Sequence, residues 1–209
     1  MRSRILLVVV AVAGLSSAAD AHFVLVSPAA SFVQNRLGDP QKIAPCGGVS
    51  ANPTRNTPAN PGTPTNAVTQ LTGGSTLHLL IQETVFHPGH YRVALARNMG
   101  QLPPDPVVTT RDSDRGPWSV SAAIQSTPEA PVLADGLFAH TERPMGLNEA
   151  DIQIPNITCV NCLLQVIQFM AEHAKNADGE YSYHHCAVVN ITADPAKPID
   201  TRWGQGSTR

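Results

Sequence analysis

Proline and glycine interrupt this chain so often that short strands are favoured over long helices. The 209 residues include 18 prolines and 15 glycines, and only 14% of the residues are charged. Between the interruptions, apolar residues alternate with their neighbours over 75–84 and 91–95, and Cys186–Thr192 has the composition of a further strand. Cys162–Met170 has apolar residues at helical spacing but also fits a strand buried on both faces, and we favour the strand. The chain is therefore predicted to be all-β.

The remaining segments fit loops and turns around these strands. They comprise an extended surface loop over Ser50–Asn66, irregular chain over 103–126, a short strand at 132–137 and a frayed polar tail over 193–209. Phe86-His-Pro-Gly-His90 lies between two predicted strands, so we expect a turn or short loop at the end of a sheet. Short strands separated by turn residues favour an immunoglobulin- or fibronectin-like β-sandwich with long loops, formed by a single domain over 22–192.

The first 21 residues have the pattern of a signal peptide. Arg2 and Arg4 precede the apolar run 5–15, and small residues lead up to Ala21. The run is too short to span a bilayer and no later segment is apolar enough, so we expect no membrane anchor. We expect cleavage after Ala21, a secreted or periplasmic protein, and a mature chain that begins with His22.

The charge balance excludes some classes of partner. Removal of the leader would take away two arginines and one aspartate, leaving 12 basic and 15 acidic residues and a formal charge near −3. This argues against a nucleic acid or an anionic membrane as partner. The remaining 188 of the 209 residues suffice for one domain with a sizeable core, and we expect a monomer.

Four cysteines permit three disulfide pairings. Cys159-Val-Asn-Cys162 could form a redox pair, half of a zinc site or a structural disulfide, and we favour the disulfide. In that case Cys46 pairs with Cys186, and closing so long a loop would stabilise the fold by about 5 kcal/mol in the chain-entropy model. Cysteines in this number fit an oxidising compartment.

Histidine is the residue type that most directly suggests chemistry. Five of the eight histidines lie at the expected mature terminus, in the predicted turn or directly before a cysteine: His22, His87, His90, His184 and His185. A histidine at the start of a mature chain offers two nitrogens, the α-amino group and ring Nδ1, which can chelate one metal ion. A third nitrogen from another imidazole would complete a set that selects copper over calcium or magnesium. Singly, a turn histidine is usually solvated, and adjacent histidines beside a strand often bond only the backbone.

Four stretches of the sequence resemble one protein family. They are His22-Phe-Val-Leu-Val-Ser-Pro28, His87-Pro-Gly-His-Tyr-Arg-Val-Ala-Leu95, Tyr181-Ser-Tyr-His-His-Cys186 and Ile154-Pro-Asn-Ile-Thr-Cys-Val-Asn-Cys-Leu-Leu-Gln-Val-Ile167. Together they are similar to the lytic polysaccharide monooxygenases, secreted copper enzymes in which an N-terminal and a later histidine form a "histidine brace". The whole also resembles a bacterial group described as polysaccharide monooxygenase-like.

The resemblance implies a metal site. His22 and His87 match the two brace positions, with His90 as the alternative to His87, and Tyr183 matches the tyrosine axial to copper. One copper ion is the implied cofactor.

The resemblance also implies roles around the metal. The family's second-sphere glutamine aligns with Tyr181, which has no amide, so His184 or His185 would take over its hydrogen bond to a bound oxygen species. Cys46 and Cys186 match a disulfide of the family.

The activity that this resemblance implies is copper-dependent oxidative cleavage of glycosidic bonds. A polysaccharide such as chitin or cellulose would be the substrate, and an external electron donor would reduce the copper. Aromatic residues make up only 5% of the chain, so few side chains are available to contact a flat substrate; Phe32, Trp118 and Trp203 are the candidates.

Two other functions fit the same residues. One is a non-catalytic secreted or periplasmic copper carrier with a histidine brace. Many such carriers cluster methionines for Cu(I), whereas Met99, Met145 and Met170 are well separated here, which favours the enzyme. The other is an extracellular adhesion or structural sandwich, in which the histidine pattern would be coincidental.

Overall fold

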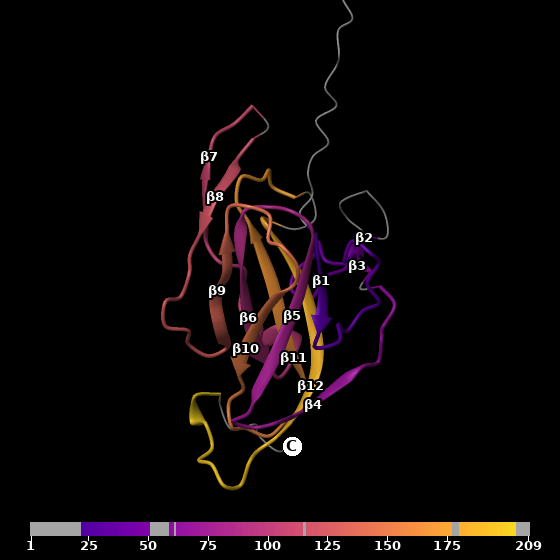
Figure 1. Ribbon diagram of the computed structural model, residues 1–209, viewed down its shortest axis with the longest axis vertical. Helices are drawn as coiled ribbons and strands as arrows, with labels where there is room; N and C mark the ends of the chain where they lie inside the picture. Colours follow the sequence, from indigo (N-terminus) through magenta and orange to yellow (C-terminus); the bar gives the residue numbers. More distant parts are fainter. Residues whose placement is uncertain (1–21, 51–58, 61, 115, 177–179, 204–209) are drawn as a thin grey trace, which may run out of the picture.

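The protein is an all-β sandwich, as the sequence pattern predicts. The computed structural model describes residues 22–50, 59–60, 62–114, 116–176 and 180–203. A three-stranded sheet in the order β1-β5-β10 lies over a five-stranded sheet in the order β4-β12-β11-β6-β9 (Figure 1).

The strands of the smaller sheet are β1 (His22–Ser27), β5 (Thr76–Val85) and β10 (Asn148–Gln153). Those of the larger sheet are β4 (Val68–Thr72), β6 (Gly89–Ala96), β9 (Val132–His140), β11 (Cys159–Met170) and β12 (Ser182–Thr192). Neighbouring strands are antiparallel except β4 and β12, which are parallel.

The core lies between the two sheets and follows the period of two residues. Alternate residues of β5, Leu77, Leu79 and Ile81, face alternate residues of β6, Tyr91 and Val93, within one hydrophobic cluster. The intervening residues of β6 are buried as well, on the other face of the sheet. The larger sheet is therefore covered on both sides.

β11 resolves the ambiguous run at Cys162–Met170 as a strand. It pairs with β12 on one edge and β6 on the other, and nearly all of its residues from Cys162 onward are buried. Apolar side chains are needed on both faces of such a central strand, which is why the spacing resembles that of a helix.

Residues 86–88 join the two sheets. β5 belongs to the smaller sheet and β6 to the larger one, so this short loop crosses from one layer to the other instead of closing a hairpin. Met170 at the end of β11 pairs with Gly89, which places the chain after β11 beside this loop.

Two expected loops contain strands. The segment 103–126 is not irregular throughout, because β7 (Val108–Arg111) and β8 (Trp118–Ala122) pair within it; η1 (Met99–Gln101) precedes it. The hairpin is difficult to predict because β7 has only one apolar residue, Val108, and β8 alternates over only five residues. Residues 51–58 and 61 of the expected loop Ser50–Asn66 lie outside the described residues, and β2 (Val49–Ser50) pairs with β3 (Ala59–Asn60).

The expected C-terminal tail is fastened to the sandwich as far as Trp203. The Asn156 side-chain amide donates to the carbonyl oxygens of Asp194, Lys197 and Pro198, and η2 (Thr201–Trp203) follows. Trp203 packs against the hydrophobic core. The prediction of a frayed tail is therefore wrong over 193–203, and residues 204–209 lie outside the described residues.

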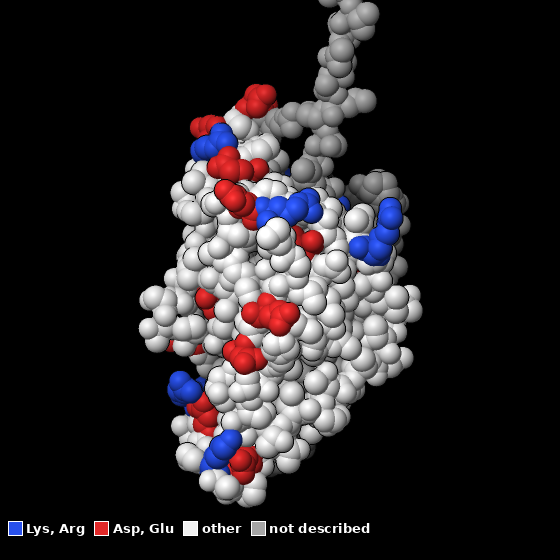
Figure 2. Space-filling view, viewed as in Figure 1, with Lys and Arg blue, Asp and Glu red and all other residues white. Residues whose placement is uncertain are grey.

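The face shown in Figure 2 is mostly uncharged. Lysine, arginine, aspartate and glutamate side chains gather at its two ends, with acidic side chains between them. Within the part of the chain that the structure describes, no helix has the length and apolar character needed to cross a membrane.

Candidate metal centre

The beginning of β1 and the loop after β5 lie at the same end of the sandwich. His22 is the first residue of β1 and pairs with Val85, the last residue of β5. His87 follows two residues later, in the loop that crosses to the larger sheet. Strand pairing thus places two of the predicted ligands, 65 residues apart in the sequence, at the same end of the sandwich.

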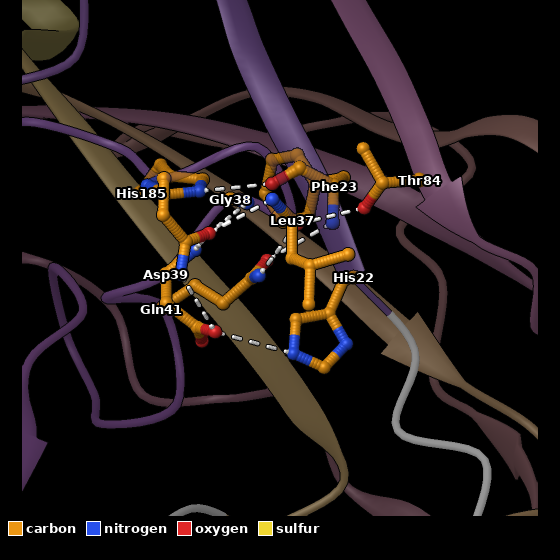
Figure 3. A network of polar contacts seen from close by, with 9 residues as sticks. His22, Phe23, Leu37, Gly38, Asp39, Gln41, Thr84 and His185 are labelled. Carbon is orange, nitrogen blue, oxygen red and sulfur yellow. Dashed lines mark hydrogen bonds and ion pairs between the residues drawn. The ribbon is translucent and has the colours of Figure 1, made fainter.

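His22 is held by the loop that follows β1. Its ring is buried, and its Nε2 lies 3.5 Å from Oδ2 of Asp39 (Figure 3). The hydrogen bond with His22 lowers the pKa of Asp39 below its ordinary value; burial opposes this shift, and the Lys42 ammonium adds to it. An ionised Asp39 accepts a hydrogen bond from Nε2–H, so Nδ1 is the nitrogen that carries the lone pair.

His87 is held by its backbone and by its ring. Its N–H donates to Oε1 of Glu83 over 2.8 Å, and its Nδ1 lies 3.2 Å from the carbonyl oxygen of Ala171. Because a carbonyl only accepts, Nδ1 carries the proton and Nε2 the lone pair. Glu83 also contacts Nε2 of His140 at 2.9 Å, which anchors the loop on a second side.

Tyr183 lies under His22. Its side chain is fully buried on β12, and the two rings meet edge to face with centroids 5.3 Å apart. The Nζ of Lys42 lies 6.0 Å from the centroid of the tyrosine ring. The structure therefore brings together His22 and Tyr183, which the sequence analysis places in one site.

His90 lies in a different place from His87. Its neighbour Tyr91 points into the core, so His90 faces the opposite side of the larger sheet, where its ring packs on Phe169. Burial lowers the pKa of His90, and the charge of Asp135 opposes that shift. This placement favours His87 over His90 as a partner of His22.

His184 and His185 lie on opposite faces of the larger sheet. His184 faces away from the core, and its Nε2 contacts both carboxylate oxygens of Asp105, at 2.8 and 3.0 Å. His185 faces the core and its Nε2 donates to the carbonyl oxygen of Phe23 over 3.1 Å. Adjacent residues of a strand point to opposite faces, so the two imidazoles cannot share one site. Tyr181, directly before β12, donates its hydroxyl hydrogen to the carbonyl oxygen of Pro117, directly before β8.

His173 is the histidine that the sequence analysis missed. Its ring lies beside that of His87, with centroids 4.7 Å apart and planes at 75°. Its Nδ1 contacts the carbonyl oxygen of Ala174. His173 follows β11 in a polar stretch without a motif. The pairing of β11 with β6 is the signal that places it next to the 86–88 loop.

Both disulfides favoured by the sequence are present. Cys46 bonds Cys186, which joins the loop after β1 to β12. Cys159 bonds Cys162 at the beginning of β11. The first bond fastens the segment that carries Asp39 to the strand that carries Tyr183.

The side chains alone do not form a metal-ligand set. Over residues 22–50, 59–60, 62–114, 116–176 and 180–203, no three His, Cys, Asp or Glu side chains come together as a group that could hold a metal ion. In the full chain the nitrogen of His22 is a peptide nitrogen, joined to Ala21. Cleavage there would convert it to an amine, and this amine with Nδ1 of His22 and Nε2 of His87 would supply three nitrogens. Such donors fit copper, and hydrogen bonds on the other ring nitrogens are typical of metal-binding histidines.

Comparison of the chain with models of known protein families gives no match, and no curated protein matches its sequence. The residues at this end of the sandwich are therefore the basis for assigning a function.

Proposed function

We propose that the protein, once residues 1–21 are removed, binds one copper ion and uses it for oxidative cleavage of glycosidic bonds in a polysaccharide. The observation that carries the proposal is the arrangement around His22. Asp39 contacts its Nε2, Tyr183 packs against its ring, and His87 lies two residues beyond its strand partner. These are the features that a chelating N-terminal histidine and a second imidazole ligand require.

Copper, when bound, would supply the redox chemistry: exchange of electrons with an external donor and activation of O2 or H2O2 for removal of hydrogen from a glycosidic carbon. The protein would orient the donors and exclude water. Asp39 and the Ala171 carbonyl would fix the tautomers of His22 and His87. The buried ring of Tyr183 would keep water from one side of His22.

His173 would handle protons beside His87. Its Nδ1 is engaged by the Ala174 carbonyl, so Nε2 is the atom that would accept and return a proton. An imidazole suits this role because its ordinary pKa is about 6.5, close to neutral pH. His173 thus takes the place proposed from sequence for His184 or His185.

Two aromatic residues lie where a substrate could contact them. The β7–β8 hairpin stands at the same end of the molecule as the start of β1 (Figure 1), and Trp118 bridges to Ala174, next to His173. Phe32 lines a groove of about 740 Å³ along β1, together with Arg36. The segment after β12, which ends at Trp203, lies at the opposite end of the molecule (yellow in Figure 1), so Trp118 and Phe32 are the better candidates for sugar contacts.

The first experiment tests copper binding at a freed terminus. Secreted protein should begin at His22 by N-terminal sequencing and bind one copper ion per chain. A matched protein that begins Met-His22 should bind copper more weakly by orders of magnitude, because its histidine nitrogen remains in a peptide bond. Equal copper affinity in the two proteins would contradict a histidine brace that uses the amine of His22.

The second experiment tests catalysis. The copper-loaded protein, a reductant and peroxide are incubated with chitin, cellulose and related glycans, and products are analysed by mass spectrometry. Oxidised oligosaccharides that disappear with copper chelation support the enzyme. Tight copper binding without oxidised products across the panel would contradict the enzyme and support a copper carrier.

A further inference from the structure

β1 is an edge strand whose outer side is paired by side chains instead of another strand. In the smaller sheet β1 has β5 on one side only. On the other side, Gln34 accepts from the N–H of Leu25 and donates to its C=O, at 2.8 and 2.9 Å. A carboxamide thus takes the part of a strand peptide, and it satisfies both outward backbone groups of that residue.

The same pattern recurs two residues earlier, next to His22. The N–H of Phe23 donates to Oε1 of Gln41 over 3.1 Å, and its C=O accepts from Nε2 of His185 over 3.1 Å (Figure 3). Both side chains are almost completely buried, Gln41 at 0% and His185 at 2% exposure. We call these two residues the Phe23 clamp.

The clamp lies at an irregularity of the strand. The register between β1 and β5 shifts between His22 and Phe23, so the ladder alone does not fix the direction of the chain there. Gln41 is itself held, because its Nε2 donates to the carbonyl of Leu37, which also accepts from Oγ1 of Thr84 on β5.

Gly38 shows how closely the loop approaches. A Cβ at this position would lie 1.9 Å from the carbonyl oxygen of Phe23, and the residue has a φ of +106°. Only glycine lets the loop reach the Phe23 peptide without displacing it.

We propose that Gln41 and His185 are positioning residues that fix the Phe23 peptide and thereby aim the nitrogen and ring of His22. This inference deepens the proposed function and depends on it for its copper readout. Both clamp residues bond the backbone of Phe23, the residue that follows His22. Losing them should loosen the chain end that must present two nitrogens to one ion, as loss of outer hydrogen-bond partners generally does at metal sites.

The test uses the processed protein beginning at His22. Gln41→Met and His185→Leu remove the two hydrogen bonds, and His185→Gln retains a donor at a position similar to Nε2. Copper affinity by competition titration should fall about 10- to 100-fold in the first two variants, with a changed Cu(II) EPR spectrum, and recover in His185→Gln. Amide exchange of Phe23, measured by NMR without copper, should become faster in Gln41→Met.

Gln34→Met is the matched control. It removes the same kind of carboxamide from the same edge of β1, but at Leu25 instead of Phe23. We expect faster exchange at Leu25, with copper affinity and EPR spectrum retained.

Copper affinity and amide exchange at Phe23 together decide the inference. Folded Gln41→Met and His185→Leu proteins with the original affinity and spectrum would overturn the inference, as would an equal loss of affinity in Gln34→Met. If the unaltered processed protein binds no copper, the proposed function fails, and exchange at Phe23 alone judges the clamp. In that case, faster exchange of the Phe23 amide in Gln41→Met but not in Gln34→Met supports the clamp. Equal exchange of the Phe23 amide in the two variants overturns it. Should His185→Leu not fold, Gln41→Met and His185→Gln decide.

Discussion

The ring of His22 meets the ring of Tyr183 edge to face, with centroids 5.3 Å apart and planes at 71°. The contact joins the first residue of β1 to β12 across the two sheets. Edge-to-face pairs are attractive beyond the area they bury, so each ring restricts the other.

We expect Tyr183→Ala to lower the free energy of unfolding by about 3 to 5 kcal/mol, because it leaves a cavity under His22. Tyr183→Phe keeps the ring contact and should retain most of the stability and the copper affinity. Urea unfolding and copper titration of both variants measure this. If Tyr183→Phe lost as much stability and copper affinity as Tyr183→Ala, the loss would be due to the hydroxyl group and not to the ring contact.

His87→Ala should weaken copper binding by two orders of magnitude or more, about 3 kcal/mol, because one nitrogen donor is lost. His90→Ala serves as its control and should leave copper affinity nearly unchanged, since His90 faces the other side of the larger sheet. Competition titration of the processed proteins ranks the two. A larger loss of copper affinity in His90→Ala than in His87→Ala would assign the ligand to His90.

His185 should make stability depend on pH. Burial lowers its pKa to about 4, with a smaller contribution from the charge of His184; the Phe23 and Gly38 carbonyls and Asp39 act in the opposite direction. Between pH 6.5 and about 4 the unfolded chain therefore binds the proton that the folded chain rejects, and stability falls as the pH is lowered.

Over that window the loss should reach about 3 kcal/mol relative to His185→Gln, which has no such titration. Urea unfolding of both proteins at several pH values between 4 and 7 measures the difference. Parallel curves for the two proteins would show that His185 titrates normally.

Gln168 should be a stability defect. Its side chain is fully buried in the same row as Tyr91 and Tyr183, and neither Nε2 nor Oε1 has a hydrogen-bond partner within the residues the structure describes. Gln168→Met should raise the free energy of unfolding by about 1 to 3 kcal/mol.

Gln165→Met is the control for that gain, because Gln165 donates to the carbonyl of Pro45 and its loss should not stabilise. Thermal and urea unfolding compare the two. A destabilised Gln168→Met protein would indicate a bound water that satisfies the amide.

The sequence was sufficient for the fold class because alternation directly reports which face of a strand is buried. β5 and β6 were predicted in this way, β12 was predicted from its composition, and β11 was chosen correctly over a helix. The β7–β8 hairpin escaped because β7 has one apolar residue, Val108, and the alternation in β8 covers only five residues. The fastened segment 193–203 escaped because its contacts go through one side chain, Asn156, which no local pattern connects to it.

The candidate site could be predicted only in part, because several of its contacts join residues that no local sequence pattern connects. His22 and Tyr183 were grouped by motif, and the structure brings them together. His173 depends on the pairing of β11 with β6, and the separation of His184 from His185 depends on strand facing, which a motif match ignores. Gln41 and His185 bond backbone groups of Phe23. Because nearly every residue has the same backbone groups, the sequence does not show which peptide a side chain will bond.

The Cys46–Cys186 bond has a consequence for how the protein is made. It spans 140 residues and joins the loop of Asp39 and Gln41 to the strand of Tyr183 and His185. Oxidation of these two thiols is thus a step in assembling the surroundings of His22. If copper binds as proposed, the site would be complete only after thiol oxidation and removal of residues 1–21, so chains produced in a reducing cytosol would have an incomplete copper site.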